Sequence, residues 1–271
     1  MRLAVTTWNI NSVRLRIAQV GRFLAKRRPD ILCLQETKCP DDRFPLEALQ
    51  AFGYPYVVHA GHKGYNGVAI VSRHPFARTE ALEWCGRRDA RHIAVTLAPE
   101  AKGAAGITVH NFYVPAGGDI PDPGLNEKFA HKLQFLRELR AWGGRAKPAG
   151  PPAILLGDLN VAPLEHDVWS HKQLLDVVSH TPVETEAFEA VRAEAGWTDA
   201  MRHLRPQPEK IYSWWSYRAA DWQAADRGRR LDHIWLSESL TPALRSVEVA
   251  RETRGWERPS DHVPVTVVVE V

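Results

Sequence analysis

Cysteine is scarce in this chain of 271 residues, and its scarcity argues against a secreted fold that depends on disulfides. The three cysteines, Cys33, Cys39 and Cys85, are odd in number and form no Cys-x-x-Cys pair. Because Cys33 lies inside an apolar run, we expect it to be a reduced thiol in the core. The pattern indicates a reducing compartment.

Long apolar runs are also missing. No stretch approaches the roughly 20 apolar residues that a membrane-spanning helix needs. Residues 1–8 enter a strand pattern directly and lack the apolar core of a signal peptide. We therefore expect a cytoplasmic protein that associates with the nucleoid if its source is bacterial, and no membrane partner.

Neither sign of charge dominates, since 35 Lys and Arg residues face 32 Asp and Glu residues, for a net charge of +3. This excess permits a polyanionic partner but does not identify one. Internal repeats, heptads and low-complexity tracts are absent as well. We expect residues 1–271 to form a single domain, with the loop-like residues 143–152 inside it.

Short apolar strands alternate with amphipathic helices along the chain, which is typical of the α/β class. The apolar spacing predicts helices from about Ser12 to Pro29 and from Leu125 to Leu139, with weaker helices at 172–179 and 184–195. A short connection at 103–106 predicts an antiparallel hairpin, so we expect a mixed sheet. The predicted strands are 3–8, 30–34, 57–59, 68–72, 91–97, 107–114, 153–156, 211–217, 231–236 and 263–269.

Polar side chains follow several of these strands. The stretch from Ala153 to Asn160 reads as a buried strand that stops at Gly157 and then presents Asp158 and Asn160 at the sheet's rim, where sites are usually built. Four other strand ends carry similar groups. The full set is Asn9, Glu36, Tyr113, Asp158 with Asn160, and Asp261 with His262.

These side chains favour a hard, oxygen-seeking cation such as Mg²⁺ or Mn²⁺, because they are carboxylates and amides without a His/Cys ligand set. Such a cation points to phosphate chemistry. Phosphodiester hydrolysis needs a water placed in line, neutralised phosphoryl oxygens and charge relief on the leaving oxygen. Aspartate or histidine can serve the first need, Asn, His and Tyr the second, and a metal on Glu the third.

Each group taken alone also has an ordinary structural interpretation. A Gly-Asp pair after a strand is a common turn, and a single glutamate such as Glu36 can be a solvated or capping group. The Ser260 to His262 stretch fits an Asx-type turn, and Tyr113 fits a half-buried strand position. The functional interpretation therefore depends on their joint occurrence.

Seven motifs follow one another in order across nearly the whole chain. They are Trp8-Asn9-Ile10-Asn11, Leu34-Gln35-Glu36-Thr37-Lys38, Tyr113-Val114-Pro115, Gly157-Asp158-Leu159-Asn160, Tyr212-Ser213-Trp214, Arg230-Leu231-Asp232 and Pro259-Ser260-Asp261-His262. Together they resemble the exonuclease III family of abasic-site (AP) endonucleases, within the endonuclease/exonuclease/phosphatase superfamily. The resemblance implies a four-layer sandwich of two packed β-sheets with helices on both outer faces and the site at one end.

The resemblance also implies roles for these residues. Glu36 and Asn9 would hold the divalent metal, with Asp261 contributing. A second ion would lie near Asp158, Asn160 and His262. Asp158 would orient or deprotonate the attacking water, or protonate the leaving group. Asn160, Tyr113 and His262 would bind the scissile phosphate. Asp261 would fix the tautomer of His262, and Asp232 would support the cluster. Whether Asp158 or the Asp261-His262 pair is the base, and whether one ion or two is used, stays open here.

Ten tryptophans are many for this length, and three of them cluster. By the resemblance, Trp214 would pack against the extrahelical sugar, and Trp215 and Trp222 would help to wall a pocket that excludes a normal nucleotide's base. Basic residues would position duplex DNA without reading its sequence. The candidates are Arg87, Arg88, Arg91, Lys128, Lys132, Arg227, Arg229 and Arg230.

One departure from the family stands after Tyr113-Val114-Pro115, where many relatives carry an asparagine and this chain continues with Ala116-Gly117-Gly118-Asp119. This acidic, glycine-rich loop leaves open the balance between abasic-site incision and 3′-end removal.

The resemblance implies a metal-dependent phosphodiesterase, expected to be a monomer, acting on double-stranded DNA. It would incise 5′ to abasic sites, act as a 3′ to 5′ exonuclease and clear blocked 3′ ends. The alternatives are a phosphatase of the same fold acting on a small or lipid phosphate ester, and a non-catalytic DNA-binding module. The absence of a membrane-binding segment argues against the first, and the competent side chain at every candidate position argues against the second.

Overall fold

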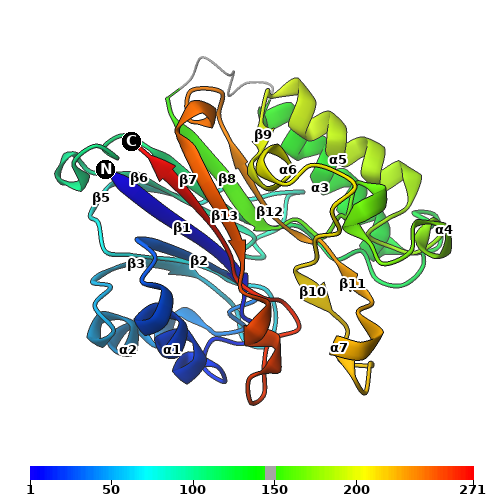
Figure 1. The fold of residues 1–271 in the computed structure, drawn as a ribbon, viewed down its shortest axis with the longest axis horizontal. Helices are drawn as coiled ribbons and strands as arrows, with labels where there is room; N and C mark the ends of the chain where they lie inside the picture. Colours follow the sequence, from blue (N-terminus) through cyan, green and yellow to red (C-terminus); the bar gives the residue numbers. More distant parts are fainter. Residues whose placement is uncertain (144–150) are drawn as a thin grey trace.

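The computed structural model describes residues 1–143 and 151–271, in which two six-stranded mixed sheets pack face to face (Figure 1). The central pair of the first sheet, β1 and β2, is parallel, and the C-terminal strand β14 pairs antiparallel with β1. In spatial order this sheet contains β13 (Leu244–Val249), β14 (Val265–Glu270), β1 (Arg2–Asn9), β2 (Ile31–Gln35), β4 (Val68–Ser72) and β3 (Tyr56–Ala60).

The second sheet has the parallel pair β7 and β8 at its centre, and β12 runs antiparallel to β8. Its spatial order is β5 (Phe76–Glu80), β6 (His92–Leu97), β7 (Thr108–Tyr113), β8 (Ala153–Asp158), β12 (Asp232–Leu236) and β9 (Thr198–Asp199). A separate two-stranded ribbon joins β10 (Trp214–Trp215) to β11 (Gly228–Arg229).

Helices cover the outer face of each sheet. Helices α1 (Ile17–Arg27) and α2 (Leu46–Ala51) pack on the first sheet through a cluster that includes Phe23, Leu49 and Leu34. Helices α3 (Glu127–Gly143) and α5 (Pro182–Glu194) pack on the second. The short helices are α4 (His171–Leu174), α6 (Ala200–Leu204) and α7 (Trp222–Ala225). This arrangement confirms the four layers that the family resemblance implied.

The central strands are almost entirely apolar because both of their faces are buried. Along β2, Ile31 and Cys33 face the core between the sheets, whereas Leu32 and Leu34 face the helices. This alternation follows from the twofold period of a strand. The thiol of Cys33 is free and fully buried, as expected.

Gly157 does not end its strand, contrary to the expectation from sequence, because β8 continues to Asp158. Its φ of 146° and its contact with β7 explain the glycine. A Cβ atom there would lie 1.9 Å from the carbonyl oxygen of Phe112, so no larger residue fits between the parallel strands.

Several other expected elements differ from the structure. The first helix begins at Ile17 rather than near Ser12, because Asn11 and Ser12 adopt positive φ values of 45° and 87°. The expected strand at 211–217 is reduced to the two residues of β10. Sequence analysis missed β5, β9, β11 and β13, which lie at sheet edges or are very short. Residues 144–150 of the expected loop lie outside the described residues.

Among the described residues, none of the helices combines the length and apolar character needed to cross a membrane.

Candidate functional site

The strand order brings the predicted polar residues to one end of the sandwich. Asn9 ends β1 and Glu36 follows its parallel neighbour β2, so both lie at the same edge. Tyr113 ends β7 directly opposite Asp158, which ends β8. Because β12 runs antiparallel to β8, it begins with Asp232 where β8 ends. The strand ends that carry these residues therefore lie together at one end of the sandwich.

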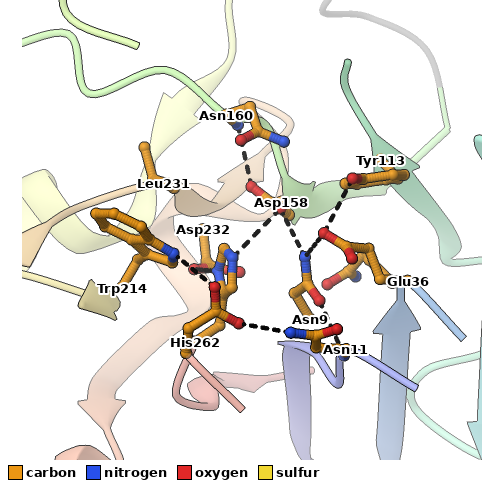
Figure 2. A network of polar contacts seen from close by, with 12 residues as sticks. Asn9, Asn11, Glu36, Tyr113, Asp158, Asn160, Trp214, Leu231, Asp232 and His262 are labelled. Carbon is orange, nitrogen blue, oxygen red and sulfur yellow. Dashed lines mark hydrogen bonds and ion pairs between the residues drawn. The ribbon is translucent and has the colours of Figure 1, made fainter. Parts of the chain in front are cut away.

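Asn9 connects the two sheets within this site (Figure 2). Its side-chain amide donates to Glu36 Oε1 at 2.9 Å and to Asp158 Oδ2 at 2.8 Å, although the two acceptors belong to different sheets. The side chain of Asn9 is fully buried. A single neutral donor therefore holds two carboxylates close together.

Glu36 is surrounded by donors. Tyr113 donates its hydroxyl to Oε1 at 2.9 Å, and the Lys38 ammonium lies 2.7 Å from Oε2. Burial alone would raise the pKa of Glu36, but the charge and hydrogen bond of Lys38, together with Asn9, outweigh burial and lower it. Glu36 is therefore an anion that attracts cations.

His262 lies between two carboxylates. Its Nδ1 is 2.8 Å from Asp232 Oδ2, and its Nε2 is 3.6 Å from Asp158 Oδ2. This geometry corrects the expectation that the adjacent Asp261 orients the ring. Residues adjacent in an extended segment point to opposite sides, so the partner of His262 comes from β12 instead.

These contacts separate the titration of the two groups. Burial is the largest influence on Asp158 and raises its pKa to about 7, with His262 opposing and Asp232 adding to the shift. Burial disfavours the charged ring of His262, but the Asp232 and Asp158 carboxylates outweigh it and raise its pKa to about 10. At neutral pH, His262 therefore carries a proton while Asp158 can exchange one.

Asp261 belongs to the rim of the site. Its Oδ2 accepts from the indole Nε1 of Trp214 at 2.9 Å, and its Oδ1 accepts from the amide of Asn11 at 3.1 Å. Asn11 Oδ1 in turn accepts from Lys38 Nζ at 2.7 Å. Asp261 is thus linked to Glu36 through Asn11 and Lys38.

The donor set is suited to a cation. Ligand atoms of Asp158, Asp232 and His262 lie within 4.8 Å of one another. Asp232 Oδ1 is buried and has no hydrogen-bond partner, so one carboxylate oxygen in the cluster is unused. Buried, unsatisfied carboxylate oxygens are unusual unless a ligand or ion completes them.

A cavity of about 570 Å³ opens beside this network. His262, Asn160 and Asp261 line it, and the indoles of Trp214 and Trp169 form part of its wall. Gly118 and Asp119, from the loop at residues 116–119, also line the cavity. Leu231, which Figure 2 shows near Trp214, lines it too. The loop after Tyr113-Val114-Pro115 therefore borders the site.

Some predicted residues lie elsewhere. Trp215 is in the core and donates to Asp226, and Trp222 packs on Trp215, so neither lines this cavity. Lys132 is fully buried and paired with Glu184, which corrects its assignment as a phosphate contact.

Arg230 is likewise fully buried, since its guanidinium pairs with Asp167 and Asp199. Lys128 is exposed near the start of α3. Arg91 pairs with Asp89 and lies over the ring of Tyr113 at 4.9 Å from its centroid.

Three residues of the site were not assigned a role from sequence. Asn11 and Lys38 each lie two positions beyond an identified ligand, inside motifs already recognised, so they could have been found there. Trp169 lies alone in a connecting segment and carries no local signal.

Two packed mixed sheets with a carboxylate, amide and histidine network at one end define a phosphoester hydrolase of the four-layer α/β type. The chain belongs to the Endonuclease/Exonuclease/phosphatase family, whose model matches residues 6–262.

Relatives within this family match over nearly full length. An exodeoxyribonuclease of Bacillus subtilis is 31% identical over 99% of this chain and 100% of its own. The structure of an AP endonuclease from Archaeoglobus fulgidus superposes with a TM-score of 0.90, at 33% identity, covering 99% of this chain and 100% of that one. A 3′ phosphatase from Neisseria, bound to a product DNA hairpin, gives 0.89 at 35% identity with the same coverage.

Proposed function

We propose that this chain is a DNA-repair nuclease that hydrolyses phosphodiester bonds with the help of Mg²⁺ or Mn²⁺. Its substrates would be double-stranded DNA with abasic sites, which it would incise on the 5′ side, and 3′ ends, which it would trim and clear. The names of the exodeoxyribonuclease, AP endonuclease and 3′ phosphatase relatives support this substrate class.

The observation that carries the proposal is the double hydrogen bond of Asn9 to Glu36 and Asp158. It places the Glu36 carboxylate, which is suited to bind a metal ion, beside the Asp158 carboxylate, which is suited to accept a proton. Hydrolysis of a phosphodiester needs both functions within reach of one phosphate.

Glu36 and Asn9, with Asp261 across the rim, would hold the divalent ion. A second ion near Asp158, Asn160 and His262 would require His262 to lose its proton, because only a neutral imidazole binds a metal. When bound, the ion would stabilise negative charge on the phosphate and the leaving oxygen. Lys38, which is the cation at Glu36 in this structure, would have to share that carboxylate.

Asp158 is the better candidate for the base. A proton acceptor must be unprotonated near neutral pH, and the raised pKa of Asp158, about 7, suits that task. The pKa of about 10 keeps His262 protonated, so its Nε2–H would donate to a phosphoryl oxygen rather than take a proton from water. Asp232 would hold the ring in place through Nδ1.

Asn160 and Tyr113 would complete the phosphate site. The Asn160 side chain lines the cavity and is anchored by its donation to the Val114 carbonyl at 2.9 Å. Burial raises the pKa of Tyr113 well above its ordinary value, with the Glu36 and Asp158 charges adding to it, so its hydroxyl remains a donor. The Trp214 indole would pack on a sugar that lacks a base.

A single gel experiment tests the proposal. A duplex with one tetrahydrofuran abasic analogue is incubated with Mg²⁺, Mn²⁺ or chelator, using the parent, Glu36→Gln and Asp158→Asn. We expect metal-dependent incision 5′ to the analogue by the parent and a loss of about 100- to 10,000-fold in the Asp158→Asn variant. An intact duplex together with release of phosphate from small phosphate esters would instead favour a phosphatase of the same fold.

A further inference from the structure

Arg229, one of the basic residues expected to contact DNA phosphates, lies in the wall of the cavity that contains His262. The hydrolytic roles proposed above do not use it. Strand β11 pairs Arg229 with Trp214, and Trp214 forms a β-bridge with His262. Two strand pairings therefore connect this arginine to the protonated histidine. The guanidinium also lies over the Trp214 ring, 5.3 Å from its centroid.

The hydrogen bonds of Arg229 leave part of its guanidinium free. Nη1 donates to the Val178 carbonyl at 3.0 Å and to Ser179 Oγ at 2.8 Å. Its Nε is buried without a partner. No carboxylate forms an ion pair with Arg229 within residues 1–143 and 151–271. Burial lowers the pKa of Arg229, and the charge of Glu184, which forms its ion pair with Lys132, opposes that shift. An arginine remains charged at neutral pH.

A half-buried cation without a counter-ion is costly in a folded protein. The neighbouring Arg230 shows the ordinary solution, since Asp167 and Asp199 neutralise it. Two more arginines, Arg218 and Arg227, line the same cavity and form no ion pair in the described part of the chain. One region of the cavity is therefore cationic.

The acidic residues of the cavity do not supply the missing counter-ion. Glu36 is paired with Lys38, and Asp261 accepts from Trp214 and Asn11. Asp119 is exposed to solvent. The cavity thus has a carboxylate-rich region at Glu36 and a separate guanidinium region at Arg229, and a substrate with a second anionic group would match both.

We propose that Arg229 is a specificity-determining residue, which binds an anionic group on the part of the substrate that keeps the scissile phosphate after cleavage. This inference rests on the proposed function and adds a preference for substrates that carry a second anionic group. Two groups have the required chemistry: the carboxylate of a 3′-terminal phosphoglycolate, and the phosphate on the 3′ side of an internal abasic sugar. A bare 3′-phosphate carries neither.

The experiment compares four duplexes. Two have the second anion: a 3′-phosphoglycolate end and an internal tetrahydrofuran. Two lack it: a 3′-phosphate end and a 3′-terminal tetrahydrofuran without a following phosphate. For each, kcat/KM is measured with the parent, Arg229→Gln, and Arg245→Gln as a matched loss of charge at a remote exposed ion pair with Glu270.

We expect Arg229→Gln to lose roughly ten- to a hundredfold on at least one substrate with the second anion, the size of a lost hydrogen bond to a charged group. For the two substrates that lack the second anion, kcat/KM should change by less than about threefold, which is smaller than the loss of such a hydrogen bond. A loss on the phosphoglycolate alone identifies the carboxylate as the partner, and a loss on the internal analogue alone identifies the phosphate. Arg229→Lys should recover part of the loss because it keeps the charge.

A purely structural role for Arg229 has a different signature. Ser179→Ala removes one of its anchors without changing charge, and should not discriminate among the four duplexes. An equal loss on all four with Arg229→Gln, no loss on any, or the same pattern with Ser179→Ala would overturn the inference. A parent that cleaves none of the duplexes would refute the proposed function instead.

Discussion

Among the described residues, two buried polar clusters have opposite designs. The first, here called the ion cluster, contains Asp167, Asp199, Arg202 and Arg230. Arg230 donates to both oxygens of Asp167 at 2.8 Å, and its Nη1 donates to Asp199 at 2.7 Å. Two carboxylates thus face two guanidiniums, and the charges balance.

The second, the site cluster, has excess negative charge. Its members are the four carboxylates of Glu36, Asp158, Asp232 and Asp261 with the ammonium of Lys38 and the imidazole of His262. With His262 protonated, two cations face three anions, or four when Asp158, whose pKa is about 7, is ionised. One carboxylate oxygen, on Asp232, has no partner at all.

This difference shows how burial can serve two purposes. A balanced and fully hydrogen-bonded cluster resists change, because removing one partner leaves an unpaired buried charge. An unbalanced cluster attracts a cation and shifts the pKa values of its members, as a catalytic site requires. Substitutions should therefore separate the two: the ion cluster should control stability and the site cluster should control activity.

The largest effect is expected from Asp158→Asn in the site cluster. Loss of the proposed base should reduce kcat about a thousandfold, or about 4 kcal/mol. The free energy of unfolding should stay the same or rise, because a buried and partly uncompensated charge is removed. Incision kinetics and urea unfolding measure the two quantities. A variant as active as the parent would exclude Asp158 as the base.

The next effect is expected from Asp167→Asn in the ion cluster. It leaves Arg230 and Arg202 without their shared carboxylate, so unfolding should become easier by about 3 kcal/mol. The kcat of the folded protein should remain within about threefold of the parent, since no residue of the ion cluster lines the cavity. A large loss of kcat with unchanged stability would reverse the assignment of the two clusters.

A divalent ion should stabilise the parent through the site cluster. At 100 times its dissociation constant, Mg²⁺ or Mn²⁺ should add about 2.7 kcal/mol to the free energy of unfolding. Glu36→Gln should abolish most of this gain. The control is Asp226→Asn, an exposed carboxylate paired with Arg251, which should keep it. Equal stabilisation of both variants would place the ion elsewhere.

The smallest effect concerns pH. Burial alone would raise the pKa of Asp167, but Arg230 and Arg202 outweigh it and hold the pKa below its ordinary value. The stabilisation is therefore complete above the unfolded pKa of about 3.9 and declines as pH falls through the folded value. Urea unfolding of the parent and Asp167→Asn should give a gap that narrows toward low pH. A constant gap would show that the carboxylate does not titrate with folding.

Much of the site was predictable because its residues follow strands with clear apolar patterns. Glu36, Asp158 and Asn9 were recognisable as strand-end groups, and parallel neighbours must end at the same edge. The motifs around them supplied the four-layer arrangement by resemblance. Edge strands such as β5 and β13 were missed, because their exposed residues dilute the apolar pattern that marks β2 and β8.

Partners across the fold were not predictable. His262 donates its Nδ1–H to Asp232, thirty positions earlier, rather than to the adjacent Asp261. Lys132 was predicted to be a basic surface residue of a helix, yet it is buried and forms an ion pair with Glu184. Nothing in the local sequence distinguishes these outcomes, since each depends on which distant segment packs against the side chain.

The amino-acid sequence by itself determined which central strands are buried and what chemical groups stand near their ends, because periodicity and turn residues are local properties. Only the tertiary structure decided which of those groups meet and which charges are neutralised. Arg229 and Arg230 show this most simply. They are identical side chains at adjacent positions that point in opposite directions, so one completes a buried ion cluster and the other faces the cavity.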